Sequence, residues 1–254
     1  MESALWLQER VKVISPSHNL SFIFHPSGIG RDIALQLSKC GAQVFAVARN
    51  PHLLSTLRDE DPSIQTLSVD LTDWAATKQA VSKILPIDLL VNNAGIVILK
   101  PVPTFDEDDV DRLFDINVKA LINVTQLVTS DLLSRKVPGA VVNVSSQTAK
   151  VGLERHAVYC GTKGAVDAYS RAVALELGPH NIRVNCVNPT VIMTEMGKQG
   201  YSDPNLAEPL KLKIPLRRFG EVREVTDAVL FLLSDKSTMI TGESLLVDGG
   251  YVQV

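Results

Sequence analysis

The chain has 254 residues, 45% hydrophobic and 21% charged, which is enough for one substantial core, so we expect a single domain over residues 1–254. A formal net charge of −3 excludes the broad basic field of a nucleic-acid binder. No run approaches the roughly 18 apolar residues of a membrane span, and Cys40, Cys160 and Cys186 form neither a disulfide pattern nor a metal-binding one, so we expect a metal-free cytoplasmic protein whose partners are small molecules and other subunits.

Two segments compete for the first strand. Val11 to Ile14 would be followed by a long inserted loop, whereas Leu20 to Phe24 leads directly to a helix at Gly28. We prefer the second segment because its apolar run suits a buried central strand and its connection to the helix has the usual length. Residues 1–19 are then an irregular N-terminal extension. Residues 11–27 are open to two interpretations, a genuine insertion or an error of the gene model.

Downstream, short β-branched runs alternate with segments of helical period. Ile29, Ile33 and Leu37 recur at four-residue spacing and predict a helix that ends at Gly41. The candidate strands that follow are Val44 to Ala48, Ile64 to Val69, Ile87 to Val91, Ala140 to Val144, Ile182 to Val187 and Ser244 to Val247. With the N-terminal strand, this alternation predicts an α/β fold with a doubly wound, Rossmann-type parallel sheet of seven strands and helices on both faces.

The longer intervening segments carry the helices. Asp106 to Arg135 predicts two helices, and Ala157 to Leu177 predicts one with Ala, Leu and Val on its inward face. Residues 194–216 contain two glycines and three prolines. We therefore expect broken helices there, in a mobile segment that covers a substrate.

Tyr159 and Lys163 lie one helical turn apart on the same face of the predicted helix. An ammonium group beside a phenol favours the phenolate, so we expect Lys163 to lower the pKa of Tyr159 and the phenol to act as a general acid. Ser146, just past a predicted strand, could hydrogen-bond the same carbonyl oxygen. Tyr and Lys at this spacing also occur on many solvated helices, so the pair alone is a weak signal.

The surrounding motifs make the chain resemble the short-chain dehydrogenase/reductase family. Its serine stands thirteen residues before the tyrosine, as Ser146 does before Tyr159. Further likenesses to family motifs are Asn92-Asn93-Ala94-Gly95, Asp115-Ile116-Asn117-Val118, Val69-Asp70-Leu71, Asn188-Pro189-Thr190-Val191-Ile192-Met193-Thr194 and Val247-Asp248-Gly249-Gly250. The match spans about residues 27 to 252, with Thr190 standing where the family most often has glycine.

The resemblance implies a role for each matched position. The catalytic tetrad would be Asn117, Ser146, Tyr159 and Lys163, with Asn117 anchoring a water that links Lys163 to solvent. The cofactor-binding residues would be Ser27, Gly28, Ile29, Gly30, Arg49, Asp70, Leu71, Asn93, Ala94, Gly95, Tyr159, Lys163, Pro189, Ile192 and Thr194. The family also implies a homotetramer.

Four further stretches resemble one branch of the family: Val144-Ser145-Ser146-Gln147, Val158-Tyr159-Cys160, Ala174-Leu175-Glu176-Leu177-Gly178-Pro179-His180 and Asn188-Pro189-Thr190-Val191. Within the family, the chain therefore most resembles the dicarbonyl/L-xylulose reductases. That likeness implies reduction of L-xylulose, another ketose or an α-dicarbonyl. It also implies that the substrate pocket is lined by Ser146, Gln147, Leu153, His156 and Tyr159. From sequence alone, His156 could equally cap the helix or face water, and Gln147 and Leu153 could be ordinary loop residues.

The cofactor is expected to be NADP(H). The end of the second strand holds Ala48-Arg49-Asn50, where Arg49 could pair with a 2′-phosphate and no carboxylate repels it. Upstream, Ile23 and Phe24 replace the threonine and first glycine of the family's phosphate loop, and His25 and Pro26 follow. Because Phe resists the tight turn and Pro lacks an amide donor, an inactive scaffold or regulatory homologue stays open as a rival. A third alternative is an NAD-linked alcohol dehydrogenase of the same fold.

Overall fold

The computed structural model describes residues 19–23 and 28–254. Within these residues all strand pairs are parallel, and they join into one sheet in the order β3-β2-β1-β4-β5-β6-β7. Its strands are β1 (Asn19–Ile23), β2 (Gln43–Ala48), β3 (Gln65–Ser68), β4 (Leu89–Asn92), β5 (Gly139–Val144), β6 (Ile182–Pro189) and β7 (Ser244–Val247). The prediction of a Rossmann-type α/β fold with a parallel sheet is confirmed.

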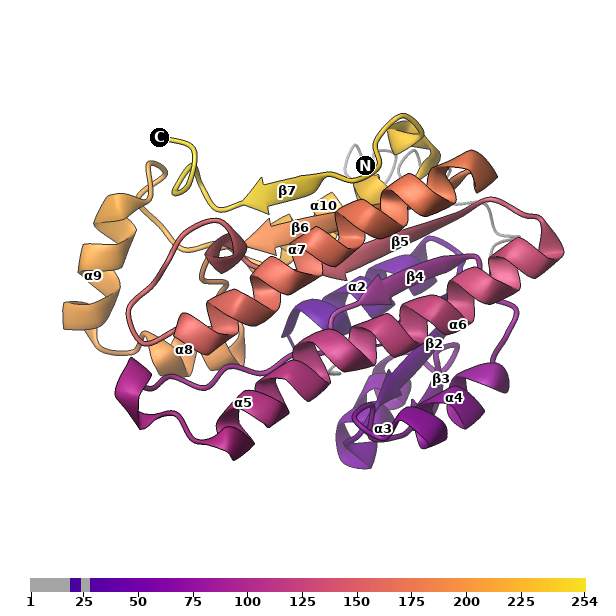
Figure 1. The fold of residues 1–254 in the computed structure, drawn as a ribbon, viewed down its shortest axis with the longest axis horizontal. Coiled ribbons are helices and arrows are strands. Elements are labelled where there is room, and N and C mark those ends of the chain that lie inside the picture. The colour runs from indigo at the N-terminus through magenta and orange to yellow at the C-terminus, as the bar shows by residue number, and fades with distance from the viewer. Residues whose placement is uncertain (1–18, 24–27) are drawn as a thin grey trace.

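Helices cover both faces of this sheet (Figure 1). One face carries α2 (Gly28–Lys39), α3 (Pro51–Glu60) and α10 (Val222–Leu233). The other face carries α4 (Trp74–Ser82), α6 (Ala120–Arg135) and α7 (Ala157–Leu177). Two layers of helices explain why the strands read as continuous apolar runs: in β5 the neighbours Val141 and Val142 point to opposite faces, and both are 0% exposed.

β1 corresponds to the preferred alternative, Leu20 to Phe24, but it begins one residue earlier, at Asn19. β1 pairs with β2 on one side and β4 on the other, with Leu20 opposite Val44 and Leu89, so it is a central strand. Asn19, which we assigned to the irregular extension, is instead the first residue of β1, because the pairing with β2 begins there. Val11 to Ile14 and the rest of the extension lie outside the described residues.

The predicted helix pair at Asp106 to Arg135 is present with a feature that periodicity does not predict. α5 (Glu107–Phe114) and α6 are joined without a loop by a π-helical segment, Asp115–Lys119. Such segments add a residue to a helical turn and often occur at functional sites. Here the π-helical segment carries Asn117.

The broken helices predicted for residues 194–216 are also present. They are α8 (Glu195–Gly200) and α9 (Pro204–Lys213), which lie beyond the carboxyl ends of β6 and β7 (Figure 1). Ala207, Ile214 and Phe219 form a small hydrophobic core of this segment. It is separate from the two cores that lie between the sheet and its helices. That this segment moves over a substrate stays a prediction. None of the helices that the structure describes is long and apolar enough to cross a bilayer.

Candidate active site

A cavity of about 330 Å³ opens at the carboxyl ends of the strands. Between β1 and β4 the connections turn to opposite sides of the sheet, and in doubly wound folds ligands bind at such a crevice. The predicted site residues that line the cavity are Gly28, Ile29, Asn93, Gly95, Ser146, Gln147, Leu153, His156, Tyr159, Lys163, Pro189, Ile192 and Thr194. The fold thus gathers segments that are more than 160 positions apart in sequence.

Ser146, Tyr159 and Lys163 meet at one wall of this cavity. Ser146 follows β5; its backbone carbonyl accepts a hydrogen bond from Asn188 Nδ2 at 2.9 Å, and its Oγ accepts one from the Thr148 amide at 3.1 Å. The hydroxyl of Ser146 lies close enough to that of Tyr159 to favour the phenolate. Lys163 Nζ lies 5.6 Å from the centre of the Tyr159 ring. The two hydroxyls therefore converge beside an amine.

The pKa of Tyr159 is raised, whereas the sequence led us to expect that the neighbouring Lys163 would lower it. Burial raises the pKa of Tyr159 to about 12, because loss of water penalises the phenolate more than the hydrogen bond from Ser146 favours it. Burial likewise lowers the pKa of Lys163 to about 8, although Cys186 and Asp167 oppose this shift. At neutral pH the phenol is therefore protonated and the amine largely charged.

Asn117 stands behind these groups in the π-helical segment. Its side chain is buried: Oδ1 accepts from the Ile96 amide at 2.8 Å, and Nδ2 donates to the Ile96 carbonyl at 3.0 Å and to Thr162 Oγ1 at 3.1 Å. A Cβ on Gly95 would lie 3.3 Å from Asn117 Oδ1 and 3.6 Å from Lys163 Nζ, so Asn117 and Lys163 approach the same glycine. Asn117 itself does not line the cavity.

Gly28 fits the dinucleotide end of the cavity. It has a φ of +57°, which glycine adopts without strain, and a Cβ there would lie 2.7 Å from Thr194 Cγ2. The amino end of α2 therefore sits directly against the segment that follows β6. Helix amino ends with free amides favour anions, and a missing side chain leaves room for a phosphate to approach.

The other predicted cofactor residues that the structure describes lie outside the cavity lining. Arg49 and Asp70 form an ion pair at 3.5 Å, with 80% and 41% of their side chains exposed. The side chain of Leu71 is buried among core residues, and Gly30 is buried within α2. Ala94 packs beside the same core as Leu71. Ser27 and the substituted loop positions Phe24, His25 and Pro26 are outside the described residues.

At the substrate end, Gln147, Leu153 and His156 all line the cavity. His156 occupies the position before α7, yet its side chain makes no capping bond, so that alternative is not observed. Its Nδ1 is instead 2.7 Å from the Glu154 carbonyl, and its ring stands edge-on to Tyr159 with 6.2 Å between the ring centres. Gln147 is only 2% exposed, and its Oε1 has no hydrogen-bond partner.

Several lining residues escaped sequence reasoning. Tyr201, just after α8, lines the cavity and packs on Phe219 with ring centres 5.2 Å apart. Val97 and Leu99 reach the cavity from the loop after β4. They lie in segments without periodicity, so sequence offered no signal for their direction. Among the residues that the structure describes, no group of three or more His, Cys, Asp or Glu side chains is arranged to hold a metal.

A Rossmann-type sheet with Ser146, Tyr159 and Lys163 at one cavity defines a class of nucleotide-dependent oxidoreductases. Residues 23–252 match a family profile described as enoyl-(acyl carrier protein) reductase. The chain is 50% identical to L-xylulose reductase from Mesocricetus auratus over 225 residues, covering 89% of this chain and 92% of that protein. It is 45% identical to carbonyl reductase [NADPH] 2 from Sus scrofa with the same coverage.

Solved structures agree with these relatives. The chain resembles a gluconate 5-dehydrogenase from Burkholderia cenocepacia in complex with NADP and tartrate, with a TM-score of 0.87 and 28% identity, covering 93% of this chain and 96% of that one. The chain belongs to the short-chain dehydrogenase/reductase family, and its relatives are oxidoreductases that act on carbonyl and alcohol groups.

Proposed function

We propose that this protein reduces a small carbonyl compound, L-xylulose or another ketose or an α-dicarbonyl, to the alcohol with NADPH. The observation that carries the proposal is the convergence of a protonated phenol, a serine hydroxyl and a buried amine at one cavity. The names of its relatives, L-xylulose reductase and carbonyl reductase [NADPH] 2, supply the substrate and the cofactor.

The residues present fit a dinucleotide. Gly28 and Thr194 form a close glycine-dependent contact at the amino end of α2, where phosphates would be held, and Asn93, Gly95, Pro189 and Ile192 would hold the nicotinamide half. The ion pair between Arg49 and Asp70 is exposed, and such pairs contribute at most about 1 kcal/mol. Arg49 could therefore exchange Asp70 for the 2′-phosphate of NADPH. When bound, NADPH supplies the hydride.

The protein's own groups supply the proton and hold the carbonyl. The hydroxyls of Ser146 and Tyr159 would both donate hydrogen bonds to the carbonyl oxygen, and Tyr159 would release its proton as negative charge develops there. Lys163 would then stabilise the phenolate by its charge. Asn117, held on the Ile96 backbone, would keep a water next to Lys163 for proton resupply.

Substrate recognition would come from the cavity wall formed by Gln147, Leu153, His156 and Tyr201. Gln147 is buried with an unpaired carbonyl oxygen, and a polyhydroxy substrate could satisfy such a group after a small rotation of the amide. His156 keeps Nε2 free when Nδ1–H donates to the Glu154 carbonyl, so Nε2 could accept from a substrate hydroxyl. Leu153 and Tyr201 would close the apolar side.

Turnover and binding together test this proposal. We expect the purified protein to oxidise NADPH in the presence of L-xylulose or diacetyl, and Tyr159→Phe to lower kcat by about 10²-fold to 10⁴-fold while leaving the NADPH Kd within about twofold. Wild-type kcat in Tyr159→Phe would refute the general-acid role.

One sequence feature favours a second candidate, a scaffold that binds cofactor poorly: Ile23, Phe24, His25 and Pro26 replace the expected phosphate loop. Calorimetric titration separates the two, because the enzyme requires micromolar NADPH binding and the scaffold requires none. Stronger binding of NADH than NADPH would favour the NAD-linked dehydrogenase. The homotetramer stays a prediction that light scattering checks.

A further inference from the structure

Residues 96–106, which are part of the loop between β4 and α5, form one side of the cavity mouth, and we call them the mouth strap. Ile96, Val97 and Leu99 line the cavity. The first residue of the strap is fixed by Asn117, which bonds both the amide and the carbonyl of Ile96. Further along, Lys100 Nζ forms ion pairs with Asp106 and Asp109 at the start of α5. The strap is thus fixed at two points, to the π-helical segment through Asn117 and to α5 through Asp109.

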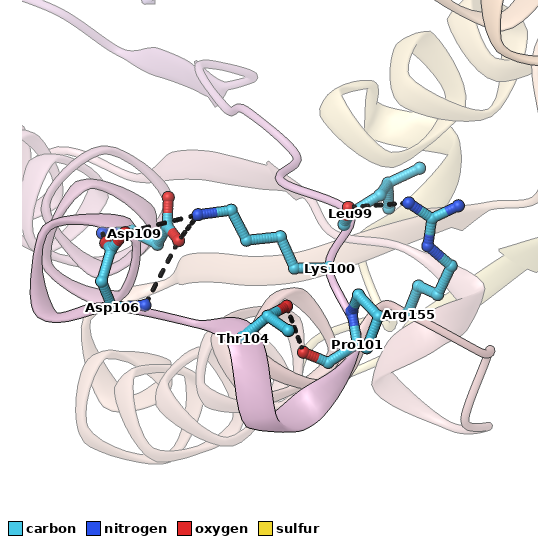
Figure 2. A network of polar contacts seen from close by, with 7 residues as sticks. All are labelled: Leu99, Lys100, Pro101, Thr104, Asp106, Asp109 and Arg155. Carbon is cyan, nitrogen blue, oxygen red and sulfur yellow. Dashed lines mark hydrogen bonds and ion pairs between the residues drawn. The ribbon is translucent and has the colours of Figure 1, made fainter.

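Arg155 joins the mouth strap to the opposite side of the mouth. The Lys100 amide donates to the Arg155 carbonyl at 3.2 Å, and Arg155 Nη2 donates to the Leu99 carbonyl at 3.3 Å. Figure 2 shows the Lys100 side chain reaching one way to Asp109 and Arg155 closing on Leu99 from the other side. Two loops that are more than fifty positions apart in sequence are therefore linked by a reciprocal pair of bonds.

The backbone at Arg155 is in an unusual conformation. Its φ is +64°, the left-handed region that a bulky residue rarely adopts. Such a conformation persists where surrounding contacts over-determine it, and it is concentrated at functional sites. The next residue is His156, whose ring stands 6.2 Å from that of Tyr159, and Leu153 accepts from the His156 amide at 3.2 Å.

We infer that Arg155 is a positioning residue for substrate recognition, which locks the loop before α7 to the mouth strap so that Leu99, Leu153 and His156 form one fixed wall. This inference rests on the proposed function, because it names what shapes the substrate wall. A wall that is ordered before binding saves the cost of ordering it when substrate arrives. Tyr159 and Lys163 are on α7, whose packing against the sheet does not involve Arg155, so the chemical step keeps its geometry.

Arg155→Asn is the discriminating variant. Asparagine tolerates left-handed backbone, so the turn is kept while the bond to the Leu99 carbonyl is lost. We expect the KM for L-xylulose or diacetyl to rise about threefold to tenfold, with kcat and the KM for NADPH within about twofold of wild type. Arg155→Lys, which keeps a long donor, should restore part of the KM. Arg58→Asn, an exposed position in α3 remote from the cavity, is the matched control.

A second variant tests whether the two contacts act as one unit. Lys100→Met removes the ion pairs with Asp106 and Asp109 and should raise the same KM. In the double variant with Arg155→Asn, the two increases should be less than multiplicative, because both loosen the same wall. Independent, fully multiplicative effects would overturn the coupling.

Amide hydrogen exchange gives a readout that does not depend on turnover. In Arg155→Asn, exchange should become faster in peptides spanning residues 97–101 and 151–156 and stay unchanged in peptides from the middle of α7. An unchanged KM with unchanged exchange would overturn the inference, and so would a joint loss of kcat, KM for NADPH and thermal stability, which marks a general folding defect. If the wild-type protein reduces no carbonyl compound, the proposed function is refuted instead. Amide hydrogen exchange alone then tests whether Arg155 orders the wall.

Discussion

Lys150→Met should destabilise the protein more than Asp167→Asn, although each variant breaks the same ion pair. Lys150 Nζ lies 2.9 Å from Asp167 Oδ2, with 32% of the Lys150 side chain exposed against 3% for Asp167. Asn188 Nδ2 contacts both carboxylate oxygens, at 3.2 and 3.1 Å, and also donates to the Ser146 carbonyl. The pair thus supports the segment that carries the serine of the site.

The difference in exposure sets the magnitudes. Without Lys150, a buried carboxylate loses its compensating charge, which costs about 3–5 kcal/mol in a fully buried pair. We expect about 2–3 kcal/mol here, because the lysine end is partly open to water and the pair is screened there. Asp167→Asn keeps an acceptor for Asn188 and lets Lys150 hydrate, so it should cost about 1 kcal/mol. At about 2–4 °C per kcal/mol, Tm should fall by about 4–12 °C for Lys150→Met and by about 2–4 °C for Asp167→Asn.

Urea and thermal unfolding followed by circular dichroism measure both values. The double variant Lys150→Met with Asp167→Asn should be more stable than Lys150→Met alone, because it buries no unpaired charge. Lys150→Arg is the control that keeps the pair. An equal loss of stability in Asp167→Asn and Lys150→Met, or a loss in the double variant equal to the sum of both, would contradict a buried unpaired charge as the cause.

Three further predictions concern the dinucleotide. Arg49→Ala should raise the Kd for NADPH about tenfold through loss of a charge-assisted contact and leave that for NADH unchanged, measured by calorimetry. Gly28→Ala should weaken NADPH binding about tenfold, because relief of a left-handed strain of about 1–2 kcal/mol and of a Cβ 2.7 Å from Thr194 would displace the amino end of α2 from the phosphates; Gly164→Ala, whose Cβ meets nothing within 4 Å, is the control. Because the pKa of Lys163 is about 8, its charge is present below that pH and lost above it, so the Kd for NADPH should rise between pH 7 and 9.5 in the wild type and stay flat in Lys163→Met, as followed by fluorescence.

Sequence predicted the framework well because two-sided burial leaves a strong local pattern. The apolar runs of β2 to β7 were located within two residues of their observed ends, and α7 within its observed bounds. The spacing of Tyr159 and Lys163 on α7 and the strand-end position of Ser146 also follow from secondary structure alone. These features depend on residues that are near in sequence, or on the rule that the carboxyl ends of all the strands in a parallel sheet lie on the same side.

What sequence could not predict depends on contacts between distant segments. The π-helical segment at Asn117 interrupts no hydrophobic pattern, and its side chain is set by the backbone of Ile96. Tyr201 reaches the cavity because of where α8 packs, and nothing in a glycine- and proline-rich segment indicates that direction. Arg155 has no motif at all, since its partners belong to the loop after β4.

The pKa of Tyr159 shows how burial changes the chemistry implied by a motif. Charge attraction alone would make the phenol a stronger acid, but the same packing that brings Lys163 close removes water from both groups, and the phenolate loses more than it gains. A phenol with a pKa of about 12 rests protonated. Under the proposed mechanism this is the form that carbonyl reduction would consume, whereas alcohol oxidation would first have to deprotonate it. If Tyr159 is the general acid, the oxidation rate should therefore increase with pH across the alkaline range while the reduction rate does not.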